Sequence, residues 1–299
     1  MKVPSLALAL ILTPLAVTAQ TKPAPEAPAA PANSLVRHYH EGETLTYHMT
    51  AVNDDWHYTV DAISTVRKSP DGPWLEEFRY SAMTSNGQPV TLAPSTADLR
   101  IALSLDPSRN PSGPDLSHVD PRLVGPITDL MTFYVDDWLF QKISFLQHPG
   151  DHFYVPNPQP SSWADGTRVL TGTDQIDFDL NVHSVDPAAH TAVLVVHHVP
   201  PPQPNIKFPA AWMQTPVAGT PNNWAEVEKT KEGKYQAGAG KETFDVTLTV
   251  STLDGRILSA TMENPVTTSS RLCDDAALMH CNDPQPHTIH RHVEITLVQ

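Results

Sequence analysis

Basic residues are scarce in this sequence of 299 residues. It holds 19 lysines and arginines against 33 aspartates and glutamates, which gives a formal net charge of −14 at pH 7. A surface this acidic repels the phosphate backbone of nucleic acids and the face of an anionic membrane. We therefore expect no nucleic-acid partner. Beyond the first 19 residues no apolar run approaches the roughly 18 residues that a spanning helix needs, so we do not expect the chain to span a membrane.

Signatures of the common enzyme classes are also missing. The sequence contains no Gly-x-Ser-x-Gly elbow of an α/β-hydrolase and no His-Glu-x-x-His pair of a zinc protease. The segment from Gly240 to Thr243 resembles the end of a phosphate-binding loop, but Tyr235 occupies the position of the first glycine. These absences favour a non-catalytic protein.

One long apolar run is present, at the start of the chain. Lys2 supplies a positive charge, residues 3–17 form the apolar run, and Val17 and Ala19 place small residues at −3 and −1 of a cleavage site. This is the layout of a secretory signal peptide. We expect residues 1–19 to be removed near Ala19 and the mature protein to be secreted or periplasmic.

Cysteine is nearly absent, because Cys273 and Cys281 are the only two. In an oxidising compartment a pair at this spacing is expected to close a small disulfide loop. The alternative is a zinc site that joins both cysteines with His280 and His287. Their spacing matches no familiar zinc finger, so we favour the disulfide.

The rest of the chain is expected to consist of a linker and one domain. Residues 20–34 are rich in proline and alanine and predict an extended linker, and residues 35–299 predict a single β-rich domain. Apolar and polar residues alternate most clearly in residues 44–51, 56–62, 243–250 and 289–297. This period of two is typical of antiparallel strands with one wet face. Asp254-Gly255 predicts a hairpin, and the apolar run 192–196 predicts a central strand covered on both faces.

Residues 126–145 depart from the strand pattern and predict a helix. Apolar residues recur at helical spacing on one face: Ile127, Leu130, Met131, Tyr134 and Trp138. Pro126 suits the first helical position, and Asp120-Pro121 offers a second start. Phe133 and Phe140 project from the opposite face, so both sides of the helix should be buried. The helix is then either part of an ordinary core or the cover of a cavity.

These patterns together predict a mainly β fold. We expect a large curved antiparallel sheet, a half-barrel or open barrel, that wraps one long helix at about residues 126–145. If the helix covers a cavity, the candidate ligand-binding residues are Tyr47, Trp56, Phe133 and Phe140.

Histidine is abundant, with 15 copies, and two pairs occupy alternate positions of predicted strands. His38 and His40 lie at the start of the first strand, and His290 and His292 lie in the last. Residues two apart on a strand share a face about 6.6–6.8 Å apart, so two such pairs on adjacent strands would converge on one metal ion. Zinc, copper or nickel would suit four imidazoles. The alternative is solvated histidine on the polar face of each strand.

Three other groups are weaker candidates. Asp177 and Asp179 share a predicted strand face with His183, and Asp136-Asp137 lie on the helix, but a glycosidase needs its carboxylates across a cleft. His197-His198 point to opposite faces of one strand, and the buried one is expected to be hydrogen-bonded in the core. Three tryptophans in loop-like surroundings either line a sugar or lipid site or anchor their loops, and we favour anchoring. They are Trp163, Trp212 and Trp224.

Two segments carry a resemblance to a known family. Residues 41–47 (Glu-Gly-Glu-Thr-Leu-Thr-Tyr) and 254–257 (Asp-Gly-Arg-Ile), together with the signal peptide, resemble periplasmic half-barrel proteins of the lipoprotein-carrier (Lol-type) family and similar secreted β proteins. The resemblance covers residues 35–68 and 243–299. It implies a curved antiparallel sheet around a helix, with lipid or acyl chains held in an apolar concavity.

Three functions follow as hypotheses. The first is a non-catalytic secreted or periplasmic protein that binds an apolar or lipid-like ligand in the concavity of its sheet. The second is a metal-dependent hydrolase that uses the strand histidines. The third is a structural or assembly partner in the cell envelope.

Overall fold

The computed structural model describes residues 34–298 except 71, 94, 95, 97, 112, 117 and 164–169. Contacts divide the chain into residues 1–32 and residues 33–299, and all described residues belong to the second unit. The predicted leader, its cleavage site and the predicted linker up to Asn33 lie outside the described residues.

Within the described residues, fifteen strands form one open antiparallel sheet. In chain order they are β1 (Thr44–Asn53), β2 (Trp56–Lys68), β3 (Trp74–Ser85), β4 (Gln88–Pro89), β5 (Ile101–Leu103), β6 (His152–Val155), β7 (Ser161–Trp163), β8 (Leu170–Asp174), β9 (Asp177–Asp186), β10 (Thr191–Val199), β11 (Trp224–Lys229), β12 (Tyr235–Glu242), β13 (Phe244–Ser251), β14 (Ile257–Cys273) and β15 (Gln285–Val298). The mainly β fold predicted from alternation is confirmed.

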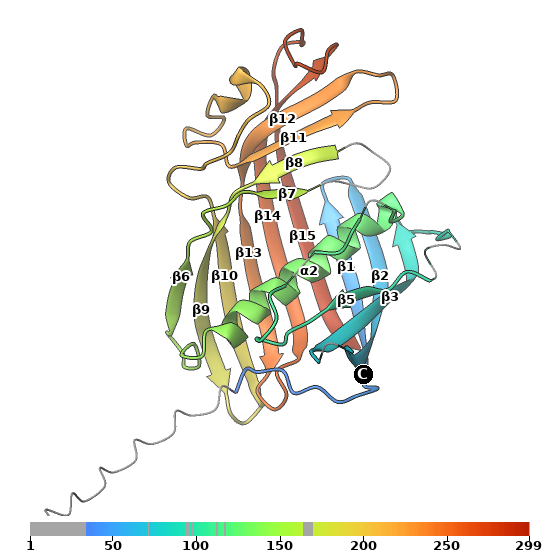
Figure 1. Ribbon diagram of the computed structural model, residues 1–299, viewed down its shortest axis with the longest axis vertical. Coiled ribbons are helices and arrows are strands. Elements are labelled where there is room, and N and C mark those ends of the chain that lie inside the picture. The colour runs from blue at the N-terminus through green and yellow to red at the C-terminus, as the bar shows by residue number, and fades with distance from the viewer. Residues whose placement is uncertain are drawn as a thin grey trace, which may run out of the picture. The chain divides into compact units, whose positions relative to one another are not determined.

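The sheet divides into two branches at β14. This strand has 17 residues, and its first half pairs with β13 while its second half pairs with β12. One branch continues through β13, β10, β9 and β6, and the other through β12, β11, β8 and β7. On the opposite edge β14 pairs with β15, and β15 pairs with β1, so the first and last strands are neighbours. Figure 1 shows the two branches parting above and beside β14.

The strands follow the predicted alternation. In β1 the side chains of Leu45, Tyr47, Met49 and Ala51 are buried, and those between them are exposed or half-buried. Residues 192–196 of β10 form a central strand, as predicted, but the prediction that both of its faces are covered is wrong. β10 lies between β9 and β13, but its side chains alternate between fully buried and half-buried, because only one face meets the core.

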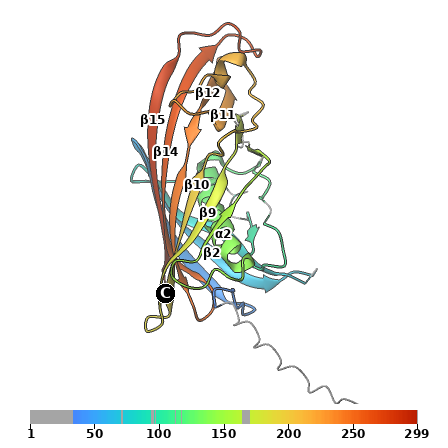
Figure 2. The same ribbon diagram turned by 90° about the vertical axis from the view of Figure 1, so that its left-hand side faces the viewer.

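One long helix, α2 (Pro121–Lys142), crosses one face of the sheet (Figures 1 and 2). The predicted helix at about 126–145 is confirmed, although it begins five residues earlier and ends three residues earlier than predicted. The helix begins at the second start, because the Asp120 carboxylate accepts the backbone N–H of Arg122 at 3.1 Å and Pro121 needs no hydrogen-bond acceptor at a first position. Pro126 lies inside the helix, and Phe145 lies beyond its end with an exposed side chain.

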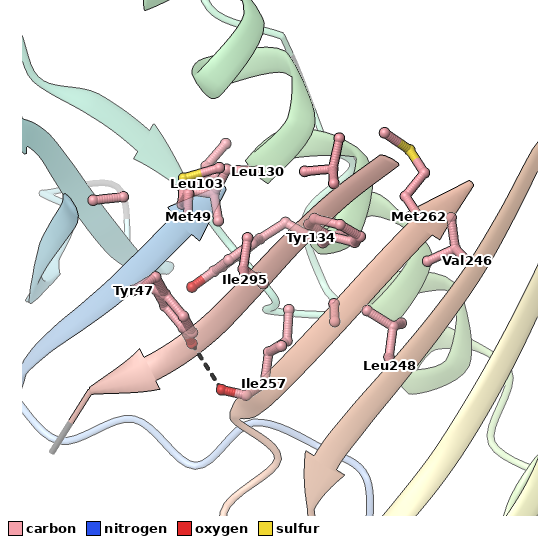
Figure 3. Packing of buried hydrophobic residues seen from close by; sticks show 14 of the residues in the cluster. Tyr47, Met49, Leu103, Leu130, Tyr134, Val246, Leu248, Ile257, Met262 and Ile295 are labelled. Atoms are coloured by element: carbon pink, nitrogen blue, oxygen red, sulfur yellow. Dashed lines mark hydrogen bonds between the residues drawn. The ribbon is translucent and has the colours of Figure 1, made fainter. Parts of the chain in front are cut away.

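The hydrophobic core fills the space between α2 and the sheet. Tyr47, Met49, Ile257 and Ile295 project from the strands toward Tyr134 of the helix (Figure 3). Phe133 and Phe140 have no exposed surface, as both predicted helix faces are buried. Beside the second half of α2 runs the segment 104–107, whose carbonyl groups accept the indole N–H of Trp138 and the ammonium of Lys142.

Cys273 and Cys281 form the predicted disulfide, with an S–S distance of 2.05 Å. The zinc alternative is wrong, because each sulfur is bonded to the other. The disulfide belongs to a second, smaller apolar cluster that includes Met213 of the short 3-10 helix η1 (Ala211–Gln214).

Candidate functional site

A cleft of about 1040 Å³ lies between the first half of α2 and the point where the sheet divides. We call it the α2 cleft. Its helical wall consists of half-buried side chains on one face of α2: Val124, Thr128, Met131, Thr132 and Val135. Its floor comes from β14 and β15, and its remaining walls come from both branches.

Strand periodicity explains which sheet residues reach the cleft. Gly240, Thr268 and His287 are direct neighbours across β12, β14 and β15, and the next row contains Glu242, Val266 and Ile289. Five of these six line the cleft, and the sixth, Gly240, has no side chain to project. Because successive side chains alternate between faces, Lys241 and Thr267 between them do not line the cleft, whereas Thr288 of β15 still reaches it.

Aromatic rings supply much of the apolar surface. Phe178 and Phe244 line the cleft from the β9–β10–β13 branch, and Trp56 lines it from the start of β2. Trp163 and Trp224 stack on each other in the other branch, with ring centroids 6.4 Å apart. A β-carbon at Gly172 would lie 1.9 Å from the Trp163 ring, so glycine is required beneath it. The predicted anchoring role of these tryptophans is therefore incomplete, since both also face the cleft.

Three carboxylates occupy the same branch. Asp174 lies directly across from Trp224, and Glu226 and Glu242 extend from the next two strands. Burial raises the pKa of Asp174 to about 6 and that of Glu242 to about 7. For Glu242 the hydrogen bond from the Asn264 amide, at 3.1 Å, opposes this rise, and the charge of Asp174 adds to it. Near neutral pH Asp174 and Glu242 can therefore donate as well as accept hydrogen bonds.

The sequence analysis missed these carboxylates. Alternating acids in a strongly negative chain are typical of a solvated strand face. The available signal was the spacing Gly238-x-Gly240-x-Glu242, because glycines on one strand face indicate close approach of another group.

A buried ion pair joins the helix to the last strand beside the cleft. Arg291 of β15 donates to Asp129 of α2, and the Tyr58 hydroxyl donates to the same carboxylate at 2.6 Å. Asp129 is 1% exposed. Burial raises the pKa of Tyr58 well above its usual value. The arrangement fixes α2 against the floor of the cleft.

A second buried pair stands at the other end of the cleft. Nε2 of His198 lies 2.8 Å from each carboxylate oxygen of Asp136, and its ring lies between Phe178 and Phe244. The prediction that one of His197 and His198 is a hydrogen-bonded core residue is confirmed for His198, whereas His197 is exposed beside Asp245. Burial raises the pKa of Asp136.

Three of the four predicted ligand-binding residues lie elsewhere. Trp56 lines the cleft, but Tyr47, Phe133 and Phe140 belong to the hydrophobic core and are not among its lining residues. The face of the helix that carries Phe133 and Phe140 is covered by the sheet rather than by a cavity, because Asp129 and Asp136 on the same face meet Arg291 and His198 of the strands. The cleft opens instead beside the first half of α2.

The predicted convergence of four histidines does not occur. β1 and β15 are paired as expected, and His292 lies opposite Val52. However, β1 begins at Thr44, and His38 and His40 precede it. The stretch of β1 from Thr44 to Val52, about 27 Å long, therefore separates His38 and His40 from His290 and His292. In the described part of the chain, no group of three or more His, Cys, Asp or Glu residues is placed to hold a metal ion.

The predicted carboxylate pair of β9 is also outside the cleft. Asp179 binds His152 on the outer face, and His183 is exposed there. Asp177 accepts the Tyr154 hydroxyl and the backbone N–H of Asn157. These residues tie β9 to neighbouring segments and do not face one another across a space.

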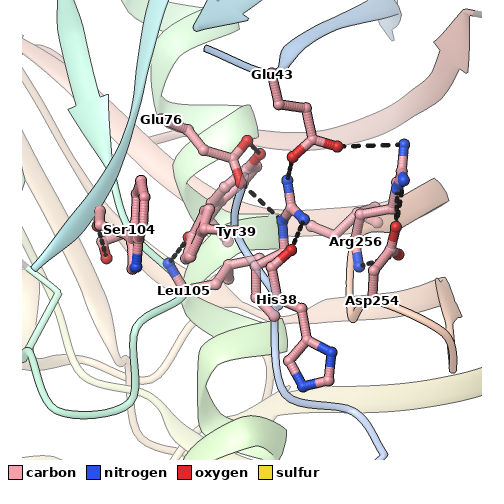
Figure 4. Close-up of polar contacts among 12 residues, drawn as sticks. His38, Tyr39, Glu43, Glu76, Ser104, Leu105, Asp254 and Arg256 are labelled. Carbon is pink, nitrogen blue, oxygen red and sulfur yellow. Dashed lines mark hydrogen bonds and ion pairs between the residues drawn. The ribbon is translucent and has the colours of Figure 1, made fainter. Parts of the chain in front are cut away.

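A buried polar network lies at the opposite end of α2. Glu76 accepts from Arg37 at 3.2 Å and from the Tyr134 hydroxyl at 2.6 Å, and Figure 4 shows Glu76 within this network. Nearby, Asp137 has no exposed surface, and one of its oxygens has no hydrogen-bond partner. Burial raises the pKa of Asp137 to about 8, and the charges of Glu76 and Asp136 add to the rise. Asp137 is therefore protonated in the folded protein at neutral pH.

We expect Asp137→Asn to remove part of the pH dependence of stability. Between pH about 4 and 8 the folded state holds a proton on Asp137 that the unfolded state has lost, so the free energy of unfolding falls as pH rises. Above pH 8 the full free-energy cost of burying the ionised carboxylate applies, at most about 6 kcal/mol. The asparagine variant should therefore gain stability relative to wild type from pH 5 to pH 9 in urea unfolding.

Asp151→Asn is a control of opposite sign. Hydrogen bonds from the backbone N–H groups of Gln147 and His148 lower the pKa of this exposed carboxyl. Its stabilising effect is present above the pKa of the unfolded chain, so the variant should lose stability equally at pH 7 and pH 9. A parallel pH profile for wild type and Asp137→Asn would contradict the assignment of Asp137.

Two further findings bear on function. Among the described residues, no helix has both the length and the apolar character to cross a membrane. Comparison with protein families, curated proteins and solved structures finds no match for the chain. A function can therefore be proposed only from the structure itself.

Proposed function

We propose that this protein is exported and binds an apolar or amphipathic small molecule in the α2 cleft without catalysing its conversion. The observation that carries the proposal is the cleft itself. Its volume of about 1040 Å³ is in the upper range of small-molecule sites, and five aromatic side chains line it. An open sheet crossed by a helix is also the arrangement that the resemblance to lipoprotein carriers implies.

The distribution of polar groups supports an amphipathic ligand. Phe178 and Phe244 of the β9–β10–β13 branch and Trp56 of β2 give the cleft apolar walls, which suit an apolar body. Asp174 and Glu242 in the other branch would face the polar end of such a molecule. Because both have raised pKa values, they can accept a hydrogen bond when ionised and donate one when protonated.

Filling the cleft should weaken binding. Thr132 lines the helical wall, so Thr132→Trp should lower affinity for the uncharged probe N-phenyl-1-naphthylamine by about tenfold or more, measured by fluorescence titration. Thr261→Trp is the matched control, because Thr261 is exposed on β14 and does not line the cleft. Equal affinity in both variants would place the bound probe outside the cleft.

A second candidate function is hydrolysis by general acid catalysis. It is favoured by one observation, two carboxylates, Asp174 and Glu242, with pKa values of about 6 and 7 in the lining of one cleft. If it holds, nitrophenyl glycosides should be hydrolysed by wild type, and Glu242→Gln should abolish turnover while keeping probe binding. Wild-type protein that binds the probe but hydrolyses none of these substrates supports the non-catalytic proposal.

A further inference from the structure

A second pocket, of about 380 Å³, lies on the face of β12 and β14 opposite the α2 cleft. Ala239, Ser269 and Arg271 line it, whereas Thr268 and Ser270, which flank Ser269 in the sequence, line the cleft. The helix η1 and the loop after it cover this face. Asn222 holds the loop in place, because its amide donates to the carbonyl groups of Met213 and Thr215 at 2.8 and 2.9 Å.

Arg271 is the charged residue of this pocket, and no described residue accepts a hydrogen bond from its side chain. Its guanidinium lies over the Trp212 ring, 4.8 Å from the centroid. Its Nε is buried without a hydrogen-bond partner, and no ion pair joins Arg271 to any residue that the structure describes. Leaving a buried donor unpaired costs about 1–3 kcal/mol, and such groups in native proteins usually meet a water or an ion. The absence of a carboxylate partner is unexpected in a chain with 33 acidic residues.

The other walls are mostly apolar and rigid. Met213, Val217 and Ala239 contribute aliphatic and thioether surface, and Pro216, Pro284 and Pro286 fix the backbone around them. The Trp212 indole N–H donates to the carbonyl of Leu278 at 3.3 Å, so the ring under Arg271 is held in place. The pocket thus combines one uncompensated cation with an apolar enclosure.

We propose that this pocket binds an organic monocarboxylate. The carboxylate would accept hydrogen bonds from the Arg271 guanidinium, which matches carboxylate geometry in a fork of two donors. The apolar body of the ligand would lie along Trp212 and the three prolines. The single positive charge of Arg271 matches a ligand with one negative charge. The protein's net charge of −14 would repel ligands that carry two or more negative charges.

This site is independent of the proposed function. It uses the opposite side chains of β12 and β14, and it takes a different class of ligand. Filling the α2 cleft with Thr132→Trp should therefore leave carboxylate binding unchanged.

The test compares three probes by NMR titration of the full chain with its disulfide intact. They are 3-phenylpropionate, its neutral amide, and acetate, which has the charge without the apolar body. We expect 3-phenylpropionate to bind in the millimolar range or better, and the other two about tenfold more weakly, since a hydrogen bond to a charged group contributes about 1.5–3 kcal/mol. Equal binding of the acid and the amide, or no binding of the acid, would overturn the proposal.

Variants of Arg271 give a second line of proof. Arg271→Gln should weaken 3-phenylpropionate binding about tenfold, whereas Arg271→Lys should retain part of it because the charge remains. Arg109→Gln removes the same charge at an exposed position and should leave binding unchanged. Should Arg271→Gln fail to fold, the acid–amide comparison on wild type still decides the question. Unchanged affinity in a folded Arg271→Gln would contradict the assignment.

Discussion

Replacing Arg37 with methionine should destabilise the folded protein by about 3–5 kcal/mol, measured by urea unfolding at pH 7. The Arg37 side chain is fully buried and donates to Glu76, to Glu43 and to the carbonyl of His38. Without it, the Tyr134 hydroxyl is the one hydrogen-bond donor that the described residues still offer to the buried Glu76 carboxylate. Because an unpaired buried carboxyl protonates more readily, the loss should be smaller at pH 5 than at pH 8.

The neighbouring residue in β3 provides a matched control. Glu77 pairs with Arg67 at 3.1 Å on the surface, where both side chains are partly exposed. Such a pair contributes about 0–1 kcal/mol, so Arg67→Met should have little effect. The double variant Arg37→Met, Glu76→Gln should recover much of the loss, since no unpaired charge is left. Similar losses for Arg37→Met and Arg67→Met would show that the buried network contributes no more than a surface pair.

Replacing Arg291 with methionine should cost a similar amount, about 3–5 kcal/mol. Arg291 is the ion-pair partner of Asp129, which is 1% exposed, and its loss would leave a charge between α2 and β15. Restoring neutrality with Asp129→Asn in the same chain should recover part of the stability. Urea unfolding of both single variants and the double variant gives the coupling energy.

His292, which directly follows Arg291 in the sequence, offers a control for the Asp129–Arg291 ion pair. It binds Glu263 and Glu294 on the outer face of the sheet, where all three side chains are well exposed. His292→Ala should therefore cost under about 1 kcal/mol. A coupling energy near zero between Asp129 and Arg291 would mean that the ion pair does not fix the helix.

The regular part of this fold could be predicted because it depends on local patterns. Period-two alternation placed β1 and β13, and the cysteine spacing predicted the disulfide. The start of α2 was harder, since two Pro starts lie five residues apart. The choice depends on Asp120, whose side chain caps the first turn, and on a helix that tolerates Pro126 in its interior.

The site could not be predicted in the same way because tertiary pairing assembles it. Asp174, Glu242 and Arg291 belong to three strands that are distant in sequence, and only the branching of the sheet at β14 brings them to one cleft. Acidic residues on a helix are usually solvated, yet Asp129 and Asp136 are buried because Arg291 and His198 meet them from the sheet. Conversely, both histidine pairs occupy alternate positions in the sequence, but they are far apart in space. His38 and His40 precede the start of β1, whereas His290 and His292 of β15 lie beside its end.

The most direct test of ligand binding in the α2 cleft is native mass spectrometry of the protein purified from cells that express the full chain. We predict a folded mass that exceeds the polypeptide by one small molecule, released on denaturation, and loss of this additional mass in Thr132→Trp but not in Thr261→Trp. A mass equal to that of the polypeptide in wild type, or an adduct that Thr132→Trp retains in full, would contradict the account.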